Sequence, residues 1–431
     1  MQQDPVLVVG TTPDYVAKIN DTYPNAALFI TDPRFRDDHR LKNIEPSAIL
    51  FSPLDSFDET FQALVQHLSA HHVNARGIAC FDCESLVLAS RLAHHLGKPF
   101  PPPEAILRSR NKYEARKTWS QAGILSPRAI MVSELNETLE FFHLIENDIV
   151  LKPISGSGSE LVFRCVTEEE VKESVGIMKS QLPRRRSNPL FTLRSDLFSG
   201  QSAVDPCNSW IAEEFISGDE FSCDFVLENG RVIILRETGK IKATDETFGS
   251  VLAYRFPPQY PEVFSLENLC HVLRLAAESL GYTWGHFMVD YIIHDNFPCM
   301  IEMTPRPGGD SIPDLIKIAT GRDLLGMHMD IMSGRPIPSN GLPKSLQTFF
   351  SVNIYAKEEG RITCLDTCRI ISQPWVKDLF LKKDVGDRIK LPPDDYDNRL
   401  IGYCVITKQN DEDFLFLANR LQELLRISVV P

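Results

Sequence analysis

The chain has 431 residues, of which 43% are hydrophobic and 24% are charged, an ordinary composition for a globular protein of two or three domains. Its formal net charge of −13 argues against a general binder of nucleic-acid backbones, and no apolar run approaches the roughly 20 residues that span a bilayer. The ten cysteines are scattered in a way that is typical of reduced thiols, so we expect a cytoplasmic protein with neither a nucleic acid nor a membrane as partner.

The first part of the chain is expected to form a parallel α/β unit. Short apolar runs at Val6–Val9, Ala26–Ile30 and Gly77–Phe81 alternate with helical patterns, the last of which is Glu84–Leu96. The spacing G-x-G-x-x-G does not follow the first run, so NAD is not expected. A proline-rich stretch at 99–103 marks the end of this unit.

Two pairs of cysteines deserve a separate interpretation. Cys80 and Cys83 are formally C-x-x-C, but there is no second pair to complete a metal site, so packing is favoured. Cys364 and Cys368 likewise have no supporting ligand cluster.

The next part of the chain surrounds a loop of small residues. A helix is predicted at Asn111–Ala122, with Gly123 just past its end, where a left-handed cap is favoured. The strand Ile149–Lys152 leads into the loop Pro153–Ser159, where small residues let backbone N–H groups approach an oxyanion and the lysine adds a positive charge. The loop does not have the Walker A spacing, so an ordinary hairpin loop is the alternative.

Two later segments are predicted to lack regular structure. Residues 183–208 turn polar and read as a mobile insertion, in which a solvated loop is favoured over a substrate contact for Arg184-Arg185-Arg186. Thr238–Pro261 has little periodicity, and a structureless stretch of that length inside a domain is often functional. Around them, apolar patterns predict three strands and a helix at Trp210–Ile216, Phe221–Leu227, Arg231–Thr238 and Ser265–Leu280.

The strongest pattern in the chain is a predicted β-hairpin. Apolar runs at Phe287–Ile293 and Cys299–Met303 flank a turn-like segment of about five residues. Each run carries one carboxylate, and folding of the hairpin about Asn296 would place Asp290 and Glu302 opposite each other on one face. Since two facing carboxylates repel each other, the pair indicates a divalent cation between them.

Neighbouring residues suggest phosphate and nucleotide chemistry at this cation. The second run continues into Pro305–Gly309 and so places Arg306 beside the proposed metal. Upstream, the apolar strand predicted at Trp210–Ile216 carries the carboxylates Glu213 and Glu214, and Glu220 opens the next strand. Backbone groups at a strand end can bind an adenine edge, and a carboxylate can accept both ribose hydroxyls; the alternative is an edge strand whose charges face water.

The last part of the chain is predicted to be a separate small α+β unit. It follows a linker at Arg335–Pro343 that contains three prolines. Its strand-like runs are Phe349–Tyr355, Ile389–Leu391 and Ile401–Ile406, and a helix is expected at Asp411–Leu425.

Taken together, these motifs resemble those of the ATP-grasp superfamily. They occur in its order, namely Asn111-Lys112, Ile149–Pro153 with its small-residue loop, Glu213–Gly218 followed by Glu220, and then Asp290 and Glu302. The resemblance implies a multidomain α/β and α+β protein with an N-terminal Rossmann-like pre-grasp domain (1–108), an ATP-grasp domain (109–340) and a small C-terminal α+β lid (341–431). The ATP-grasp domain would have two subdomains, at about 109–182 and 209–340.

The resemblance also implies which residues bind ATP. Two lysines and the small-residue loop would hold the phosphates, backbone groups at the strand end would meet the adenine, and one glutamate would meet the ribose. These residues are Lys112, Lys152, Ser155, Gly156, Ser157, Gly158, Glu213, Phe215, Ile216 and Glu220.

Metal binding and catalysis are expected at the hairpin. Asp290, Glu302 and Thr304 would bind one or two Mg²⁺ ions, with Mn²⁺ as an alternative. The run from Glu302 to Gly309 is similar to the pattern E-[IV]-N-P-R-x-G-G of carboxylate–amine ligases that join amino acids. Thr304 replaces the asparagine of that pattern, and a hydroxyl is a weaker ligand than an amide carbonyl, so a second metal position stays open.

The implied reaction joins a small-molecule carboxylate to an amine, and at least one substrate is expected to be an amino acid. The γ-phosphate of ATP is transferred to the carboxylate, the amine attacks the resulting acyl phosphate, and phosphate leaves. Arg306 is the expected catalytic residue, because it would stabilise the charge that develops on the carbonyl oxygen. The resemblance also suggests a homodimer.

Two other functions remain as alternatives. A carboxylase or carbamoyl-phosphate-synthase type of enzyme would use bicarbonate, but it would need a biotin-carrier partner or an ammonia-supplying subunit. A non-catalytic ATP-binding regulatory protein is favoured only by Thr304. His286 could be a ligand or a base near the hairpin, although a structural histidine is the favoured interpretation.

Overall fold

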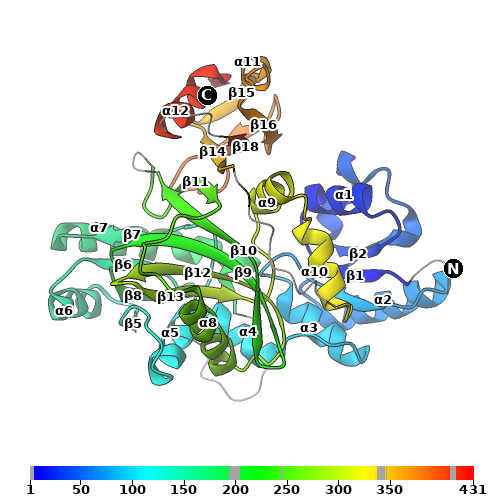
Figure 1. Ribbon diagram of the computed structural model, residues 1–431, viewed down its shortest axis with the longest axis horizontal. Helices are drawn as coiled ribbons and strands as arrows, with labels where there is room; N and C mark the ends of the chain where they lie inside the picture. The colour runs from blue at the N-terminus through cyan, green and yellow to red at the C-terminus, as the bar shows by residue number, and fades with distance from the viewer. Residues whose placement is uncertain (1–3, 194–203, 244–245, 337–344, 346, 408–413) are drawn as a thin grey trace.

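The computed structural model describes residues 4–193, 204–243, 246–336, 345, 347–407 and 414–431 (Figure 1). Residues 194–203 of the expected insertion, most of the linker expected at 335–343 and the start of the helix expected at 411–425 lie outside these ranges. Among the helices so described, none is long and apolar enough to cross a bilayer.

The N-terminal unit is a parallel sheet with helices between its strands, as the alternating sequence pattern predicts. Its four strands lie in the order β3-β2-β1-β4. The first two strands are buried along their whole length, which explains why their sequences are continuously apolar. The elements are β1 (Val6–Val9), α1 (Pro13–Thr22), β2 (Ala27–Thr31), β3 (Ile49–Phe51), α2 (Phe57–His71), β4 (Gly77–Ala79) and α3 (Leu86–His95).

The second unit is a small antiparallel sheet in the order β5-β8-β6-β7. Two of its helices begin at side-chain caps: the Asn111 side chain accepts from Glu114 N at the start of α5, and Thr167 accepts from Glu170 N at the start of α7. The elements are α4 (Pro103–Arg110), α5 (Lys112–Gln121), β5 (Ala129–Val132), α6 (Leu135–Ile145), β6 (Ile149–Pro153), β7 (Phe163–Cys165), α7 (Glu168–Gln181), η4 (Leu182–Arg185), η5 (Pro189–Phe191) and β8 (Trp210–Glu214).

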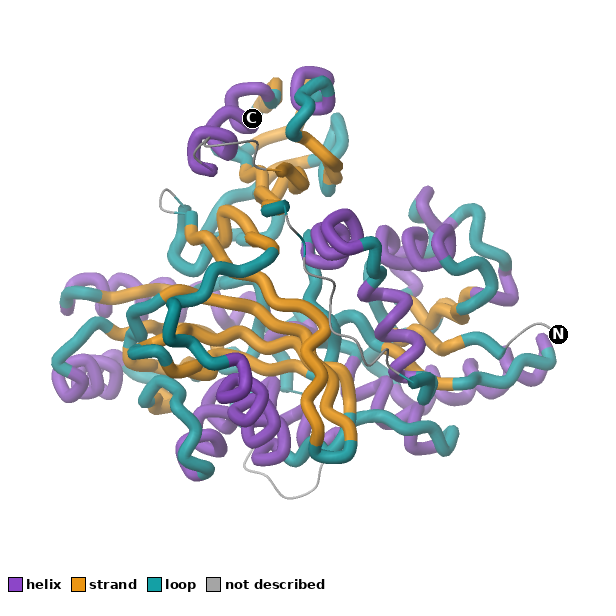
Figure 2. Tube along the Cα trace, in the orientation of Figure 1, coloured by secondary structure: helices purple, strands orange, loops and turns teal. Residues whose placement is uncertain are grey.

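The centre of the molecule is an eight-stranded sheet in the order β13-β12-β9-β10-β11-β14-β18-β16 (Figure 2). Its first five strands come from the middle of the chain, and α8 packs on it with a buried stripe that includes Leu269, Leu273 and Leu280. The elements are β9 (Asp219–Glu228), β10 (Arg231–Lys242), β11 (Val251–Phe256), α8 (Leu266–Leu280), β12 (Gly285–His294), β13 (Phe297–Thr304), α9 (Ile312–Thr320) and α10 (Leu324–Met332).

Three strands of the C-terminal segment continue the central sheet. β14 pairs with β11 from Ala253↔Val352 to Phe256↔Phe349, and β18 and β16 follow it. A second, three-stranded sheet in the order β17-β15-β19 completes this segment, which lies at the top of Figure 1. The elements are β14 (Phe349–Tyr355), β15 (Gly360–Asp366), α11 (Cys368–Ile371), β16 (Val376–Leu381), β17 (Arg388–Ile389), β18 (Leu400–Thr407), α12 (Phe414–Leu424) and β19 (Arg426–Val430).

Two expectations about irregular segments are wrong. The stretch Thr238–Pro261 contains the end of β10, which runs to Lys242, and all of β11. The β12–β13 turn has two residues rather than about five, and both Asp295 (φ 49°) and Asn296 (φ 67°) are left-handed, as a type I′ turn requires. Tertiary pairing stabilises strands whose own sequences show little alternation.

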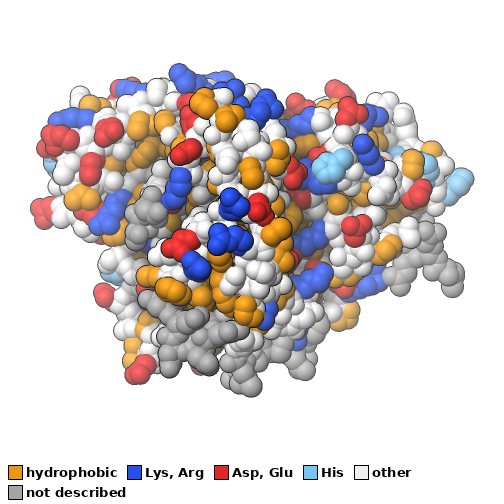
Figure 3. Space-filling model, turned by 90° about the horizontal axis from the view of Figure 1, so that it is seen from above, with side chains coloured by type: hydrophobic (Ala, Val, Ile, Leu, Met, Phe, Trp, Pro, Cys, Tyr) orange, Lys and Arg blue, Asp and Glu red, His pale blue; other side chains and the backbone are white. Residues whose placement is uncertain are grey.

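Surface charges of both signs are interspersed on the face seen in Figure 3. Each of the ten cysteines is free, and Cys364 and Cys368 are exposed.

Candidate active site

The central sheet packs α8 against one face and carries a group of charged side chains on the other. Phe221, Phe225 and Phe287 lie on the face covered by α8 and belong to the main hydrophobic core. The residues between them along β9, Ser222 and Asp224, point to the other face. That second face gathers buried and half-buried charged side chains from β9, β10, β12 and β13.

The facing carboxylates of the hairpin are present as predicted. Asp290 on β12 pairs directly with Glu302 on β13, and it also pairs with Ser222 on β9. Directly paired residues of an antiparallel sheet share a face. The predicted proximity of Asp290 and Glu302 is therefore confirmed.

A bulge produces this pairing, because the turn alone would not. With a turn at residues 295 and 296, an uninterrupted ladder would pair Glu302 with Val289 and place the two carboxylates on opposite faces. The register shifts by one residue between Asp290 and Tyr291, which leaves Ile301 as the extra residue on β13. The bulge therefore turns Glu302 to the polar face.

Lys240 lies between two carboxylates on this face and was not anticipated from the sequence. Its Nζ is 2.6 Å from Asp290 Oδ2 and 2.9 Å from Glu220 Oε1. Burial raises the pKa of Glu220, but the Lys240 ammonium outweighs this and the net shift is downward. The expected ribose ligand is thus held by a lysine next to the expected metal ligand.

The oxygen atoms at the hairpin fit a magnesium ion. Within the described part of the chain, Asp290 Oδ1 is buried and has no hydrogen-bond partner. Burial also raises the pKa of this carboxyl. Thr304 is on the same face, two residues after Glu302. No group of three or more His, Cys, Asp or Glu side chains in the described residues could hold a metal by itself. Mg²⁺ suits such a site, since it is usually bound by one or two carboxylates together with phosphates and water.

Lys112 joins the hairpin to the small-residue loop. Its Nζ is 3.5 Å from Glu302 Oε1 and donates to the Gly156 carbonyl oxygen at 2.9 Å. Burial raises the pKa of Glu302, but surrounding cations led by Lys112 lower it overall. Glu302 is therefore ionised at neutral pH and available as a cation ligand.

Lys152 sits in a buried network with one carboxylate and one further cation. Its Nζ is 2.5 Å from Glu213 Oε2, and Arg116 Nε is 3.0 Å from Glu213 Oε1. Burial lowers the pKa of Lys152 to about 8 despite the attraction of Glu213. The Glu213 side chain thus forms an ion pair with Lys152, whereas the sequence had suggested only a backbone role for this residue.

This lowered pKa predicts that ATP binds more weakly in alkaline solution. The folded ammonium loses its proton above about pH 8, whereas an unfolded lysine keeps it to about pH 10.4. We expect the dissociation constant of ATP to rise by up to about tenfold per pH unit above 8, and Lys152→Arg to flatten this rise because guanidinium stays charged.

The free energy of unfolding should change in the other direction. The folded protein binds fewer protons than the unfolded chain between about pH 8 and 10.4, so the contribution of Lys152 to stability rises with pH in that window. Isothermal titration and urea unfolding from pH 7 to 9.5 measure the two effects separately.

The expected adenine strand is present, but one of its donors is already used. The Phe215 N–H donates to the Asp148 carbonyl oxygen at 2.9 Å, and the guanidinium of Arg164 lies 3.9 Å from the centre of the Phe215 ring. Ile216 follows the end of β8 and is partly exposed. The adenine role of these residues stays a prediction.

The small-residue loop is packed against part of the expected insertion. Gly156 (φ 147°) and Gly158 (φ 69°) have backbone angles that favour glycine, Ser157 lies between them, and a β-carbon at Gly156 would approach the Phe191 ring at 3.2 Å. Ser155 Oγ donates to the Leu190 carbonyl oxygen at 2.9 Å. The expectation of a mobile segment is therefore wrong for η5, where Phe191 is fully buried.

Arg306 is held by the N-terminal unit. Its Nε donates to Cys83 Sγ at 3.0 Å and its Nη1 to the Pro307 carbonyl oxygen at 2.7 Å, while Cys83 Sγ is 3.8 Å from Thr304 Oγ1. The C-x-x-C segment thus reaches the hairpin and positions the arginine, which is more than the packing role expected of Cys83.

A fully buried ion pair fixes the loop that carries Arg306. Asp224 accepts from Gly308 N at 3.0 and 3.1 Å and from Arg236 Nη2 at 2.8 Å, and both charged side chains are 0% exposed. A β-carbon at position 308 would collide with Arg236 Nη2, which explains the glycine there. A second bulge, at Leu235, turns Arg236 to the face of Asp224.

Removal of this buried charge should destabilise the protein strongly. Asp224→Ala leaves the Arg236 guanidinium buried without its partner, so we expect the free energy of unfolding to fall by about 3–5 kcal/mol in urea titrations. Glu423→Ala, which removes a solvent-exposed pair with Arg420, should cost under about 1 kcal/mol. Equal losses in the two variants would contradict the role of Asp224.

Comparison with known proteins agrees with this arrangement. Residues 145–314 match the family model described as an ATP-grasp domain, a range that begins just before β6 and ends in α9. The chain contains an ATP-grasp domain. It includes Lys152, the small-residue loop, Glu220, the hairpin and Arg306.

Solved structures with the same fold cover the whole length of the chain. The L-amino acid ligase from Bacillus licheniformis superposes with a TM-score of 0.76 at 18% identity and covers 100% of both chains. Phosphoribosylglycinamide synthetase from Anaerococcus prevotii gives 0.67 at 16% identity, covering 99% of this chain and 100% of the other. Biotin carboxylase from Campylobacter jejuni gives 0.65 at 15% identity, covering 99% and 93%. These similarities confirm the ATP-grasp fold for the full chain.

A curated relative also aligns over most of the chain. It is the uncharacterized protein y4rH of Sinorhizobium fredii (strain NBRC 101917 / NGR234), 23% identical over 421 residues, which are 97% of this chain and 80% of that protein. Its printed name assigns no activity.

The structure also bears on two residues outside the main motifs, His286 and Arg185. His286 is fully buried, shares a hydrogen bond of 3.2 Å with His328, and burial lowers its pKa to about 3, which agrees with a structural histidine. Arg185 is buried and donates to Glu160 Oε1 at 2.8 Å and to the Pro393 carbonyl oxygen at 2.8 Å. The expectation of a solvated loop is wrong for Arg185, which ties the small sheet to the C-terminal segment.

The sequence could have indicated Lys240, which was missed. Arg236, Thr238 and Lys240 alternate along β10 and would have extended the strand past Thr238. Arg116, Cys83 and the N-terminal contact of Arg306 depend on packing between distant segments, for which a single sequence gives no signal.

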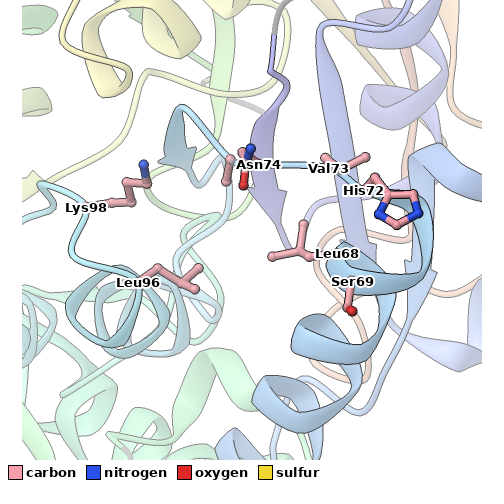
Figure 4. Close-up of a pocket in the computed structure, with 8 residues that line it drawn as sticks. Leu68, Ser69, His72, Val73, Asn74, Leu96 and Lys98 are labelled. Carbon is pink, nitrogen blue, oxygen red and sulfur yellow. The ribbon is translucent and has the colours of Figure 1, made fainter.

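A surface pocket lies on the N-terminal unit, between the end of α2 and the loop after α3 (Figure 4). Its lining includes Leu68, His72, Leu96 and one ammonium group, Lys98, but no carboxylate. It lacks the oxygen ligands found at the hairpin, so we assign the chemistry to the hairpin.

Proposed function

We propose that this protein is an ATP- and Mg²⁺-dependent ligase that activates a carboxylate as an acyl phosphate and couples it to an amine. The observation that carries the proposal is the convergence at one hairpin: Asp290 faces Glu302, and the loop that follows presents Arg306. A cation site next to an arginine suits transfer of a phosphoryl group followed by attack on a carbonyl.

Lysines from three elements support the phosphate side of this reaction. Lys112 donates to the loop at Gly156, Lys152 precedes the loop on β6, and Lys240 offsets the charge of Asp290 and Glu220. When bound between Asp290 and Glu302, Mg²⁺ would neutralise phosphate oxygens. The side chains thus hold ATP with its terminal phosphate towards Arg306.

The carboxylate then becomes a competent acyl donor. One carboxylate oxygen attacks the γ-phosphorus and ADP leaves; the amine nitrogen next attacks the acyl carbon, the C–O bond to phosphate breaks, and the amine loses a proton. Negative charge develops on the carbonyl oxygen in this second step. Arg306 stabilises it, because its guanidinium is fixed by Cys83 and Pro307 before the substrate arrives.

An amino acid is the proposed substrate class. Support comes from the run Glu302–Gly309 and from the full-length similarity to a structure named as an L-amino acid ligase. Because that similarity shows the fold alone, the substrate must be tested directly.

The test measures ADP released from Mg-ATP on addition of pairs of amino acids, with the condensed product identified by mass spectrometry. We expect release that requires both partners and one product molecule for each ADP. ADP release with ¹⁸O-bicarbonate, and transfer of ¹⁸O into phosphate, would favour the carboxylase-type alternative. If no amino acid, other carboxylate or bicarbonate stimulates release, the ligase proposal fails.

A further inference from the structure

Arg110 is a buried arginine that the mechanism above does not use. It ends α4, is 7% exposed, and its Nη2 donates to the carbonyl oxygens of Pro189 and Leu190, both at 3.2 Å. Its Nη1 is also buried, but it has no hydrogen-bond partner anywhere in the described chain. Because an unpaired buried charged donor is costly, Arg110 Nη1 points to a missing anionic ligand.

A small cavity at the centre of the site lies beside this arginine. Arg110 lines this cavity together with Ser155 and Gly156 of the small-residue loop and with Glu302 and Thr304 of β13. Its volume is about 10 Å³, roughly the space of one water molecule, so it excludes a nucleotide and admits no more than one oxygen atom of a group such as a carboxylate. It therefore lies where the phosphate loop and the metal ligands meet.

The cavity also extends to the acyl-transfer side of the site. Cys83, which accepts the hydrogen bond of Arg306, is part of its lining. A group bound there would lie between the terminal phosphate and Arg306. In the proposed reaction that position belongs to the carboxylate that receives the phosphoryl group.

The surrounding charges leave Arg110 able to bind an anion. Burial and the nearby Asp82 raise the pKa of Glu84 to about 7, while Arg110 and Arg306 oppose this rise. Glu84 is thus partly neutral near pH 7 and does not permanently compensate either guanidinium. Lys112 and Lys152 are already paired with Glu302 and Glu213 beside the phosphate loop.

We propose that Arg110 Nη1 binds the carboxylate of the acyl substrate and holds it for phosphoryl transfer. This assignment rests on the proposed ligase function. The carbonyl oxygens of η5 fix one side of the guanidinium, so the arginine is already held at the edge of the cavity before substrate binds. The packed part of the insertion thereby has a role: it positions Arg110.

The test separates activation of the carboxylate from coupling to the amine. Each proteinogenic L-amino acid and acetate is incubated with Mg-ATP and hydroxylamine, whose nitrogen attacks the acyl phosphate to give a hydroxamate and free phosphate. In Arg110→Gln we expect KM for the carboxylate to rise about 10- to 100-fold, which is what the loss of a charge-assisted hydrogen bond produces. The dissociation constant of Mg-ATP should stay within about twofold.

A matched control is available on the same helix. Arg108 donates through Nη1 to the Leu280 carbonyl oxygen at 2.5 Å, at the end of α8, and does not line the cavity. Arg108→Gln should leave both KM and ATP affinity within about twofold, even if it lowers the melting temperature. If Arg110→Gln lowers the melting temperature with KM unchanged, Arg110 is only structural; if ATP affinity falls while KM is unchanged, the nitrogen binds a phosphate. Either result overturns the proposal.

A binding measurement decides the assignment without turnover. The same amino acids are added to wild type and Arg110→Gln loaded with Mg-ADP, and the melting temperature is recorded. A rise in wild type that is lost in Arg110→Gln supports the carboxylate subsite. Equal rises in both proteins, or no rise in either, reject it. Absence of hydroxamate in wild type together with a rise specific to wild type would overturn the ligase function but not the subsite.

Discussion

Arg306→Ala is expected to abolish ligation while ATP binding is retained. The substitution removes the guanidinium that Cys83 and the Pro307 carbonyl hold beside Thr304, and loss of one pre-oriented donor to a developing oxyanion costs about 10²–10³-fold in rate. The lysines and carboxylates around the phosphates are untouched, so the dissociation constant of Mg-ATP should change by less than about twofold. Product formation by mass spectrometry and ATP binding by calorimetry measure the two quantities.

Two further variants make the Arg306 experiment specific. Arg306→Lys keeps the charge but loses the planar donors, so it should recover only part of the rate. Arg361→Ala, at an exposed position on β15, should be indistinguishable from wild type. Product formation at the wild-type rate in Arg306→Ala would exclude this residue from catalysis.

Glu302→Gln is expected to uncouple ATP binding from magnesium. The change removes one of the two facing carboxylates but keeps nearly the same shape, so the hairpin should still fold. Metal assistance to phosphoryl transfer is worth several kcal/mol, so we expect the ligation rate to fall about 10²–10⁴-fold. The gain in ATP affinity on replacing EDTA by Mg²⁺ should also largely disappear.

The companion variants test whether the two carboxylates act together. Asp290→Asn should have a similar effect, and the double variant should be little worse than either single one, because both remove the same ion. Glu228→Gln, at the exposed end of β9, is the control with the same chemical change. A full magnesium dependence in Glu302→Gln would show that the cation is bound elsewhere.

Several parts of the site could be predicted from the sequence because they are local. A carboxylate on each strand of an apolar hairpin, a strand that ends at a lysine before small residues, and an arginine a few residues after the second strand are readable without a structure. The left-handed residue expected just past α5, Gly123 (φ 71°), was readable for the same reason, since a cap involves neighbouring residues.

The elements that were predicted wrongly depend on long-range pairing. β11 has no clear alternation, but it lies between β10 and β14 and its ladder hydrogen bonds are satisfied from both sides. The C-terminal strands form part of the central sheet through the same pairing. A single sequence does not specify which distant strand will be a neighbour.

What the sequence determined by itself was the chemistry available: two carboxylates, lysines, a loop of small residues and Arg306 in a fixed order. What only the tertiary structure decided was which side chains share a face. The extra residues Ile301 and Leu235 turn Glu302 and Arg236 to the polar face, because one inserted residue reverses the side on which every later side chain points. The hairpin carried the residues of a metal site, and the bulges and the packing of the N-terminal unit brought them together.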